Sequence, residues 1–172
     1  MELLPGYCIR HGSSLDRALL VKFMQLTYQE MSSAGDFSHL AQTVQQYFSS
    51  QTPLWWVDFL GMEKDTETLG HQEGETLSFS HSPRSTVASL WMGNAIDQVT
   101  GDRHTHIFLL YVVPEHRRRG IATALMRYAE DWAKKRGDHQ IGLQVFQSNQ
   151  AALNLYNHLG YETQSLWLKK LL

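Results

Sequence analysis

The spacing of apolar residues changes along the chain between a helical and a strand period, and these changes mark the expected elements. Helical spacing predicts a helix over residues 13–31, with Ser13 and Asp16 spaced as a capping box, and a shorter helix over 39–50. Runs rich in aromatic and β-branched residues predict strands over 7–10, 53–61, 87–96 and 105–113. The last of these is almost continuously apolar, which is typical of a strand covered on both faces.

A clear helical period begins at Gly120, after which apolar residues share one face and charged residues the other. A strand is predicted over 140–146, a helix over 148–160 and a final strand or hairpin over 161–172. Residues 62–86 show little periodicity, which predicts a long surface loop or a hairpin around Gly74. The order β-α-α-β-β-β-α-β-α-β-β predicts one α/β (α+β) domain over 1–172, with helices on both faces of a mixed sheet.

Composition and charge narrow the classes of function. The 172 residues have a formal net charge of −2 and 42% hydrophobic residues, which is ordinary for a globular domain. No segment approaches the roughly 20 apolar residues that span a bilayer, and the first residues lack the pattern of a secretory signal. The single cysteine, Cys8, excludes an internal disulfide and a cysteine-based zinc site. We therefore expect a cytoplasmic protein with no membrane partner and no metal.

Three arginines and a glycine, Arg117 to Gly120, stand between the strand over 105–113 and the helix that follows. The first turn of a helix has unpaired N–H donors and the positive end of the helix dipole, and Gly120 lets a ligand approach the backbone. This order of elements favours a phosphate-binding turn, although a solvated basic turn is an alternative. The sequence lacks the Walker and dinucleotide-binding motifs, and its negative net charge disfavours a nucleic-acid surface.

Two motifs in the second half carry a resemblance to a known family. "RRRGIA" after "LYVVPEH" resembles the acetyl-coenzyme A (acetyl-CoA) signature of the GNAT superfamily of N-acetyltransferases, with Arg117, Gly120 and Ala122 at its defining positions. "SNQAALNLYNHLGYE" is similar to the family's second motif, in which Asn149 and Tyr156 are included. The clear match covers residues 87–172, and the first half agrees in its order of elements.

The resemblance implies a GNAT-like fold and a binding site for acetyl-CoA. The sheet is expected to be mostly antiparallel, with about six to seven strands splayed between the fourth and fifth, flanked by four helices. In the family the pyrophosphate lies on backbone amides, here 118–123, and the pantetheine arm follows the preceding strand, where a bulge near Leu110 and Tyr111 would open the sheet. The implied cofactor contacts are Leu110, Tyr111, Val112, Arg117, Arg118, Arg119, Gly120, Ile121, Ala122, Thr123, Asn149 and Tyr156.

Two side chains are candidates for proton transfer. Tyr156 matches the family's usual general acid, and a tyrosine with a reference pKa of about 10 is protonated at neutral pH and can protonate a leaving thiolate. His106 lies where some members carry a catalytic glutamate or histidine, and its reference pKa of about 6.5 suits a base. Ordered water as the base, a structural role for His104 and His106, and half of a metal site are the alternatives.

The acceptor is expected to be a primary amine of a small molecule or a peptide. Tyr28, Glu30 and Trp55 are candidate acceptor contacts, together with Asp36, Phe37 and Trp56, because carboxylates and aromatic rings suit a cation. Ribosomal-protein acetylating members commonly have "LEVR" where this chain has "LQVF", which argues against protein N-termini. A homodimer is compatible with the sequence. A non-catalytic acetyl-CoA-binding module is the second hypothesis, and nucleic-acid binding through Arg117, Arg118 and Arg119 is the third.

Overall fold

The structure, a computed structural model, describes residues 1–31, 35–61 and 85–171. One sheet contains six strands in the order β1-β2-β3-β4-β5-β6, so that neighbours in sequence are neighbours in space. The strands are β1 Glu2–Leu4, β2 Tyr7–His11, β3 Leu54–Phe59, β4 Ser85–Ile96, β5 Arg103–Val112 and β6 Ile141–Leu143. The α-helices are α1 Arg17–Met31, α2 His39–Tyr47, α3 Ile121–Lys135 and α4 Gln150–His158, and two 3-10 turns are η1 Ser14–Asp16 and η2 Pro114–His116.

Strand direction confirms the predicted class of fold. Each pair from β1–β2 to β4–β5 is antiparallel, and β5 and β6 are parallel because α3 crosses between them. The sheet is therefore mixed and mostly antiparallel, and the four helices flank it. The prediction of an α/β (α+β) fold is confirmed, and the six strands of the described residues lie within the predicted range of about six to seven.

The two ends of the chain differ from the prediction. At the start, Glu2–Leu4 forms an additional strand that turns at Gly6, whose φ is +78°, into β2. Three residues are too few to show a period, which is why the sequence does not reveal this strand. At the end, residues 162–171 form no strand, and Trp167 is 78% exposed. Their apolar residues are consecutive rather than alternating, so a strand here would have no single apolar face to bury.

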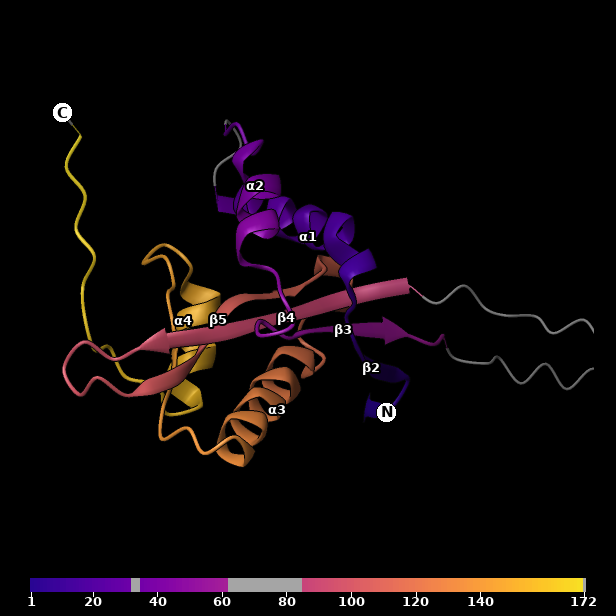
Figure 1. Cartoon of the computed structure of the whole chain (residues 1–172). Coiled ribbons are helices and arrows are strands. Elements are labelled where there is room, and N and C mark those ends of the chain that lie inside the picture. The colour runs from indigo at the N-terminus through magenta and orange to yellow at the C-terminus, as the bar shows by residue number, and fades with distance from the viewer. Residues whose placement is uncertain (32–34, 62–84, 172) are drawn as a thin grey trace, which may run out of the picture.

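Helices cover both faces of the sheet. α1 and α2 lie on one face and α3 on the opposite one (Figure 1), and α4 packs with α3 against the same apolar cluster. The two faces are called here the α1/α2 face and the α3/α4 face. Trp55 belongs to the cluster on the α3/α4 face and Trp56 to the cluster on the α1/α2 face, as alternation along β3 requires. These two cores fix the position of β5, the strand on which the candidate site depends.

The predicted loop over 62–86 is tested only at its end. Ser85 and Thr86 are the first residues of β4 and not of a loop, because they pair with Phe59 and Asp58 of β3. Residues 62–84 lie outside the described part of the chain. Within the described ranges, no helix combines the length and the apolar character needed to cross a bilayer.

Candidate functional site

The candidate site begins where β5 and β6 separate. The two strands share three register pairs, of which the last joins Ile107 to Leu143, while β5 continues to Val112. On its other side β5 stays paired with β4 as far as Val112 and Ala88. Residues 108–112 therefore have one backbone edge that pairs with no strand of the described residues, called here the open edge of β5. The predicted splay between the fourth and fifth expected strands lies here.

A bulge accompanies this separation. Trp91 of β4 pairs with Leu109 and Met92 pairs with Ile107, so Phe108 is an extra residue in β5. The predicted bulge near Leu110 and Tyr111 is thus displaced by two to three residues, because an apolar run gives no sign of where its extra residue falls. A bulge at this point increases the local twist and helps β5 to turn away from β6.

The turn into α3 presents free backbone donors. Gly120 precedes the helix with φ of +82°, and Arg118 also has a positive φ, +62°, which is unusual for a residue with a Cβ. The first backbone hydrogen bond of the helix runs from the Ala124 N–H to the Gly120 carbonyl. Among the described residues, the N–H groups of 118–123 donate no backbone hydrogen bond outside the helix. These donors at the positive end of a helix dipole fit an anion such as a pyrophosphate.

The arginine side chains at this turn hold the turn to the rest of the protein. Arg117 Nε donates to the Val112 carbonyl at 2.8 Å, and its Nη2 lies 2.6 Å from Glu30 Oε1. Arg119 donates to the Tyr7 hydroxyl at 3.0 Å and to the Glu115 carbonyl at 3.1 Å. Two of the three predicted cofactor arginines therefore already have partners in the chain, and the backbone offers the free donors.

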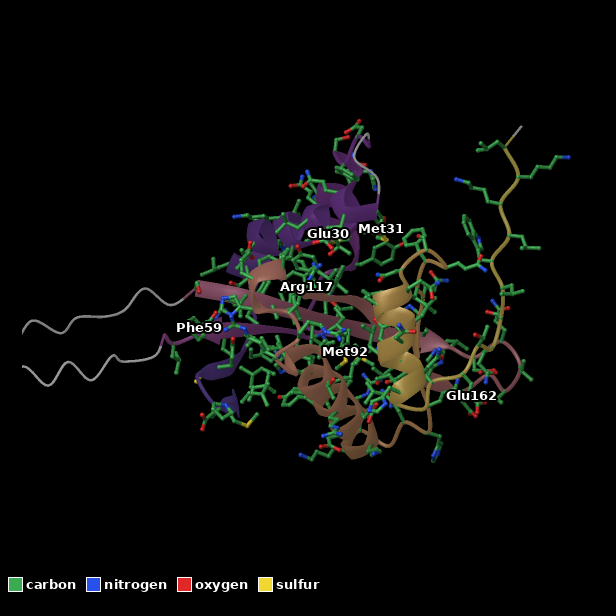
Figure 2. The ribbon with its side chains drawn as sticks, turned by 180° about the vertical axis from the view of Figure 1, so that it is seen from behind. Glu30, Met31, Phe59, Met92, Arg117 and Glu162 are labelled. Atoms are coloured by element: carbon green, nitrogen blue, oxygen red, sulfur yellow. The ribbon has the colours of Figure 1, made fainter. Side chains whose placement is uncertain are left out.

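Glu30 connects α1 to this turn. Its Oε1 accepts hydrogen bonds from Arg117 and from the Tyr111 hydroxyl, the latter at 2.8 Å, and Figure 2 shows Glu30 on α1 beside Arg117. Burial, reinforced by Glu30, raises the pKa of Tyr111 to about 12, so its hydroxyl stays a donor. The carboxylate is thus bonded to two residues of the chain, whereas the sequence suggests it as a contact of the acceptor.

Tyr156 lies on α4 on the α3/α4 side of the sheet, packed against the apolar cluster that α3 covers. Burial raises its pKa to about 12, and its ring lies 5.8 Å from that of Tyr161. The hydroxyl is therefore protonated throughout the neutral range. Asn149 caps the same helix, because its Oδ1 accepts the Ala152 N–H at 3.1 Å, and this leaves the side-chain NH₂ free to donate.

His106 lies one residue before the separation of β5 and β6, paired with Gly142. Its ring is 6.4 Å from that of His104 and 5.4 Å from that of Phe108. Burial, with the charge of His104, lowers the pKa of His106, so that the imidazole is neutral near pH 7. In the described ranges, no group of three or more His, Cys, Asp and Glu side chains is arranged to hold a metal ion.

The predicted acceptor contacts differ in their exposure and packing. Trp55 is 4% exposed and packs edge-on against Tyr128 and Trp132 of α3, and this burial argues against its prediction as an acceptor contact. Two consecutive strand residues face opposite helix layers, and the sequence does not show which of the two residues faces which layer. Tyr28 is half-buried on α1 and stacks with Phe37 at 6.4 Å. It stays a prediction.

Some residues of the site are not apparent from the sequence. The Tyr7 hydroxyl of β2 accepts a hydrogen bond from Arg119 and forms another with His116 Nδ1 at 2.9 Å, and these two bonds fix the turn before α3. Phe108 is the bulged residue beside His106. Tyr7 lies more than a hundred positions from its partners, and only the pairing of β strands brings them together.

Comparisons with known proteins agree with this geometry. The sequence model of the Acetyltransferase (GNAT) family matches residues 22–161. A [ribosomal protein bS18]-alanine N-acetyltransferase of Escherichia coli strain K12 is 33% identical over 101 residues, which are 58% of this chain and 65% of that protein. An uncharacterised N-acetyltransferase of Methanocaldococcus jannaschii is 34% identical over 82 residues, 46% of this chain and 34% of the relative. The match thus spans less than two thirds of either relative.

Solved structures share the fold over nearly the whole chain. A putative acetyl transferase from Pyrococcus furiosus has a TM-score of 0.69 at 20% identity and covers 96% of this chain and 99% of its own. A predicted acetyltransferase with acetyl-CoA from Clostridium acetobutylicum has a TM-score of 0.66 at 19% identity, covering 95% of each chain. At this identity the likeness concerns the fold alone. Since the family model spans most of the chain, the protein belongs to the Acetyltransferase (GNAT) family.

Proposed function

We propose that this protein is an acetyl-CoA-dependent N-acetyltransferase that acts on a primary amine by direct attack. The observation that carries the proposal is the row of free N–H donors over 118–123, which adjoins the open edge of β5. A site of this kind can hold a pyrophosphate at one end and an extended arm along a strand edge. Family membership supports the same reaction class.

Bound acetyl-CoA would supply an activated acetyl thioester. The backbone of 118–123 would hold its pyrophosphate, with Arg118 and Thr123 within this row, and Arg117 and Arg119 would keep the turn in place. The open edge of β5 at Leu110, Tyr111 and Val112 would pair with the pantetheine amides, since these backbone groups have no β6 partner. The side-chain NH₂ of Asn149 is a further donor. A backbone N–H at the bulge would stabilise the oxygen that gains negative charge.

His106 is the proposed base. Attack joins the amine nitrogen to the acetyl carbon and breaks the carbon–sulfur bond, so one proton must leave nitrogen and one must reach sulfur. A neutral imidazole with a lowered pKa cannot readily deprotonate a free ammonium of pKa about 10, but it can accept the proton from a nitrogen that has already formed its bond to carbon. Ordered water is the alternative acceptor of this proton.

Tyr156 is the proposed acid. Its pKa of about 12 is higher than the 8.5 or so of an ordinary thiol, so proton transfer to a water-exposed thiolate would be uphill. Burial raises the pKa of a thiol as well, and a sulfur leaving beside the same apolar cluster would be more basic than in water. The hydroxyl would first donate a hydrogen bond to sulfur and then complete the transfer.

The structure gives no support to a covalent acetyl-enzyme intermediate on sulfur. Cys8 is the single cysteine, and it lies on β2, three strands away from β5 in the sheet. A nucleophile there would be separated from the open edge by β3 and β4. Direct transfer therefore requires fewer assumptions than a ping-pong route.

A non-catalytic acetyl-CoA-binding module is the competing function, and the partly buried, protonated Tyr156 favours the enzyme because binding alone has no need of an acid. Nucleic-acid binding is disfavoured, because the side chains of Arg117 and Arg119 are hydrogen-bonded within the chain. A cytoplasmic location stays a prediction.

Self-association also stays a prediction. The described features that favour it are the outer edge of β6, which has no neighbouring strand in the described sheet, and the exposed apolar residues of the tail over 162–171. Light scattering of the full chain and of a chain ending at residue 163 tests it. A dimer that becomes a monomer on truncation would support the tail as the contact, and a monomer in both would exclude it.

Two measurements separate the functions. Calorimetry with coenzyme A and with duplex DNA shows which of the two binds, and a steep salt dependence of DNA binding would indicate a nucleic-acid-binding protein. A thiol-release assay with acetyl-CoA and a panel of amines then tests catalysis. We expect release that depends on an added amine. Binding without release for the whole panel would point to the non-catalytic module.

A further inference from the structure

Phe108 is exposed at the point where β5 leaves β6. Its neighbours Ile107 and Leu109 are buried, whereas 39% of Phe108 is accessible to solvent. It is the extra residue of the bulge, and in a bulge two successive side chains turn toward the same face of the sheet. The face is the α1/α2 face, because Leu109 and Trp91, whose ring lies 5.0 Å from that of Phe108, belong to the cluster there.

The ring is held in place although it is exposed. Trp91 is buried behind it, and Gly93 of β4 leaves the space that the ring occupies, since a Cβ at Gly93 would lie 2.3 Å from a Phe108 ring carbon. Packing against a buried tryptophan and a bare backbone fixes the ring and leaves part of its apolar surface open. An aromatic ring with a fixed position loses little entropy when a ligand packs on it.

This surface adjoins the proposed base. The Phe108 and His106 rings are 5.4 Å apart on the same face of β5, while Thr105 and Ile107 face the other way. A nitrogen within hydrogen-bond reach of His106 would therefore carry its nearest substituents over Phe108. Aromatic pairs place their centroids about 4.5–7 Å apart, so a ring stacked on Phe108 and an amine at His106 would be joined by a short linker of roughly one to three atoms.

The segment that follows β6, on the other side of the open edge, also presents uncharged and apolar side chains. Gly142, which faces both histidines, is followed by the uncharged Gln144 and by Phe146, which is 54% exposed. Glu30, the carboxylate of α1, is hydrogen-bonded to Tyr111 and Arg117. Among the described residues, no carboxylate forms a hydrogen bond or ion pair with His106. An apolar amine suits these walls better than a highly charged one.

We propose that Phe108 determines specificity, and that the acceptor is a small primary amine whose aromatic ring packs on Phe108 through a short linker. The inference rests on the proposed function, because it assumes that the amine reacts beside His106. The alternative class of acceptor is a peptide N-terminus, for which the ring of Phe108 would have no special value.

The test compares matched acceptors and matched variants. 2-Phenylethylamine, n-butylamine and an alanine-initiated hexapeptide are assayed by thiol release with the wild type, Phe108→Ala, Phe108→Leu and the control Val99→Ala. Val99 is 93% exposed in the turn between β4 and β5, away from the open edge. Coenzyme A affinity of each variant, measured by calorimetry, shows that it is folded.

We expect kcat/KM for 2-phenylethylamine to exceed that for n-butylamine about tenfold or more in the wild type. Phe108→Ala should lower kcat/KM for 2-phenylethylamine about tenfold and kcat/KM for n-butylamine less than threefold. Phe108→Leu should restore part of the loss for 2-phenylethylamine, and Val99→Ala should change kcat/KM for neither amine. Equal losses for both amines, or a preference for the peptide, would overturn this inference alone. No release with any acceptor, at intact coenzyme A affinity, would overturn the proposed function with it.

Discussion

Replacing Gly120 tests whether the backbone, rather than the arginines, binds the cofactor. A Cβ at Gly120 would meet nothing closer than Leu4 Cδ1 at 3.9 Å, so the folded protein has room for a side chain. The backbone has φ of +82°, and this conformation costs an L-residue about 1–2 kcal/mol. We therefore expect Gly120→Ala and Gly120→Glu to fold with slightly reduced stability.

The effect on binding is larger than the effect on folding. Hydrogen bonds to a charged group contribute about 1.5–3 kcal/mol each, so a glutamate that displaces an anion from two of the free N–H groups should cost about 3–6 kcal/mol. This corresponds to a rise in Kd of roughly 10²- to 10⁴-fold. Arg117 is different, since its side chain is 40% exposed and paired with Glu30. Because an exposed ion pair contributes about 0–1 kcal/mol, Arg117→Ala should raise the Kd for coenzyme A at most about fivefold.

Calorimetry with coenzyme A is the assay, and thermal unfolding followed by circular dichroism is the control for folding. Gly120→Ala is the matched variant, because it has the same backbone strain as Gly120→Glu without the negative charge. We expect binding to weaken in the order Arg117→Ala, Gly120→Ala, Gly120→Glu. A loss in Arg117→Ala as large as that in Gly120→Glu would contradict a backbone site and assign the pyrophosphate to side chains.

Three further predictions follow from the site and the core. Tyr156→Phe should lower kcat by about 10²- to 10⁴-fold with little change in coenzyme A affinity, and wild-type activity should show no falling limb below about pH 11, because the pKa of Tyr156 is about 12. Since the pKa of His106 is lowered and the base must be neutral, kcat should rise with pH through a midpoint below the ordinary histidine pKa of about 6.5, and His106→Ala should remove this limb; an unchanged profile would exclude His106 as the base. Asp138 accepts from Arg103, Arg136 and Thr105, and although burial opposes ionisation these partners hold its pKa below the usual range. Its stabilising effect is therefore complete above about pH 4 and lost as pH falls through its pKa in the folded state. Asp138→Asn should cost about 2–4 kcal/mol in urea unfolding at pH 7, and a cost below about 1 kcal/mol would contradict the structural role.

The sequence predicts most reliably the elements whose pattern matches their burial. α3 is apparent because its buried residues, among them Ile121, Leu125 and Ala129, recur at helical spacing on one face. The turn before it is apparent because a glycine and arginines stand between a strand and a helix. Both features are local, and the order of strands follows from short connections between neighbours.

The features that escape prediction depend on distant residues or on the choice between two covered faces. The pairing of Glu30 with Arg117 joins positions 87 apart, and no period in the sequence indicates it. Trp55 and Trp56 are equally apolar, and because helices cover both faces of β3 the sequence does not say which one faces α1. The bulge at Phe108 falls inside a continuous apolar run, where one extra residue leaves the pattern unchanged.

The proposed function requires that this chain transfers an acetyl group to an amine while the cofactor lies along the open edge of β5. The most direct measurement is thiol release from acetyl-CoA with the best acceptor of an amine panel, with the product identified by mass spectrometry, in the wild type and in Tyr156→Phe. We expect one thiol released for each N-acetylated amine, intersecting initial-velocity lines typical of direct transfer, and a large loss of kcat in the variant. Coenzyme A binding without amine-dependent release, or release that Tyr156→Phe leaves unchanged, would contradict it.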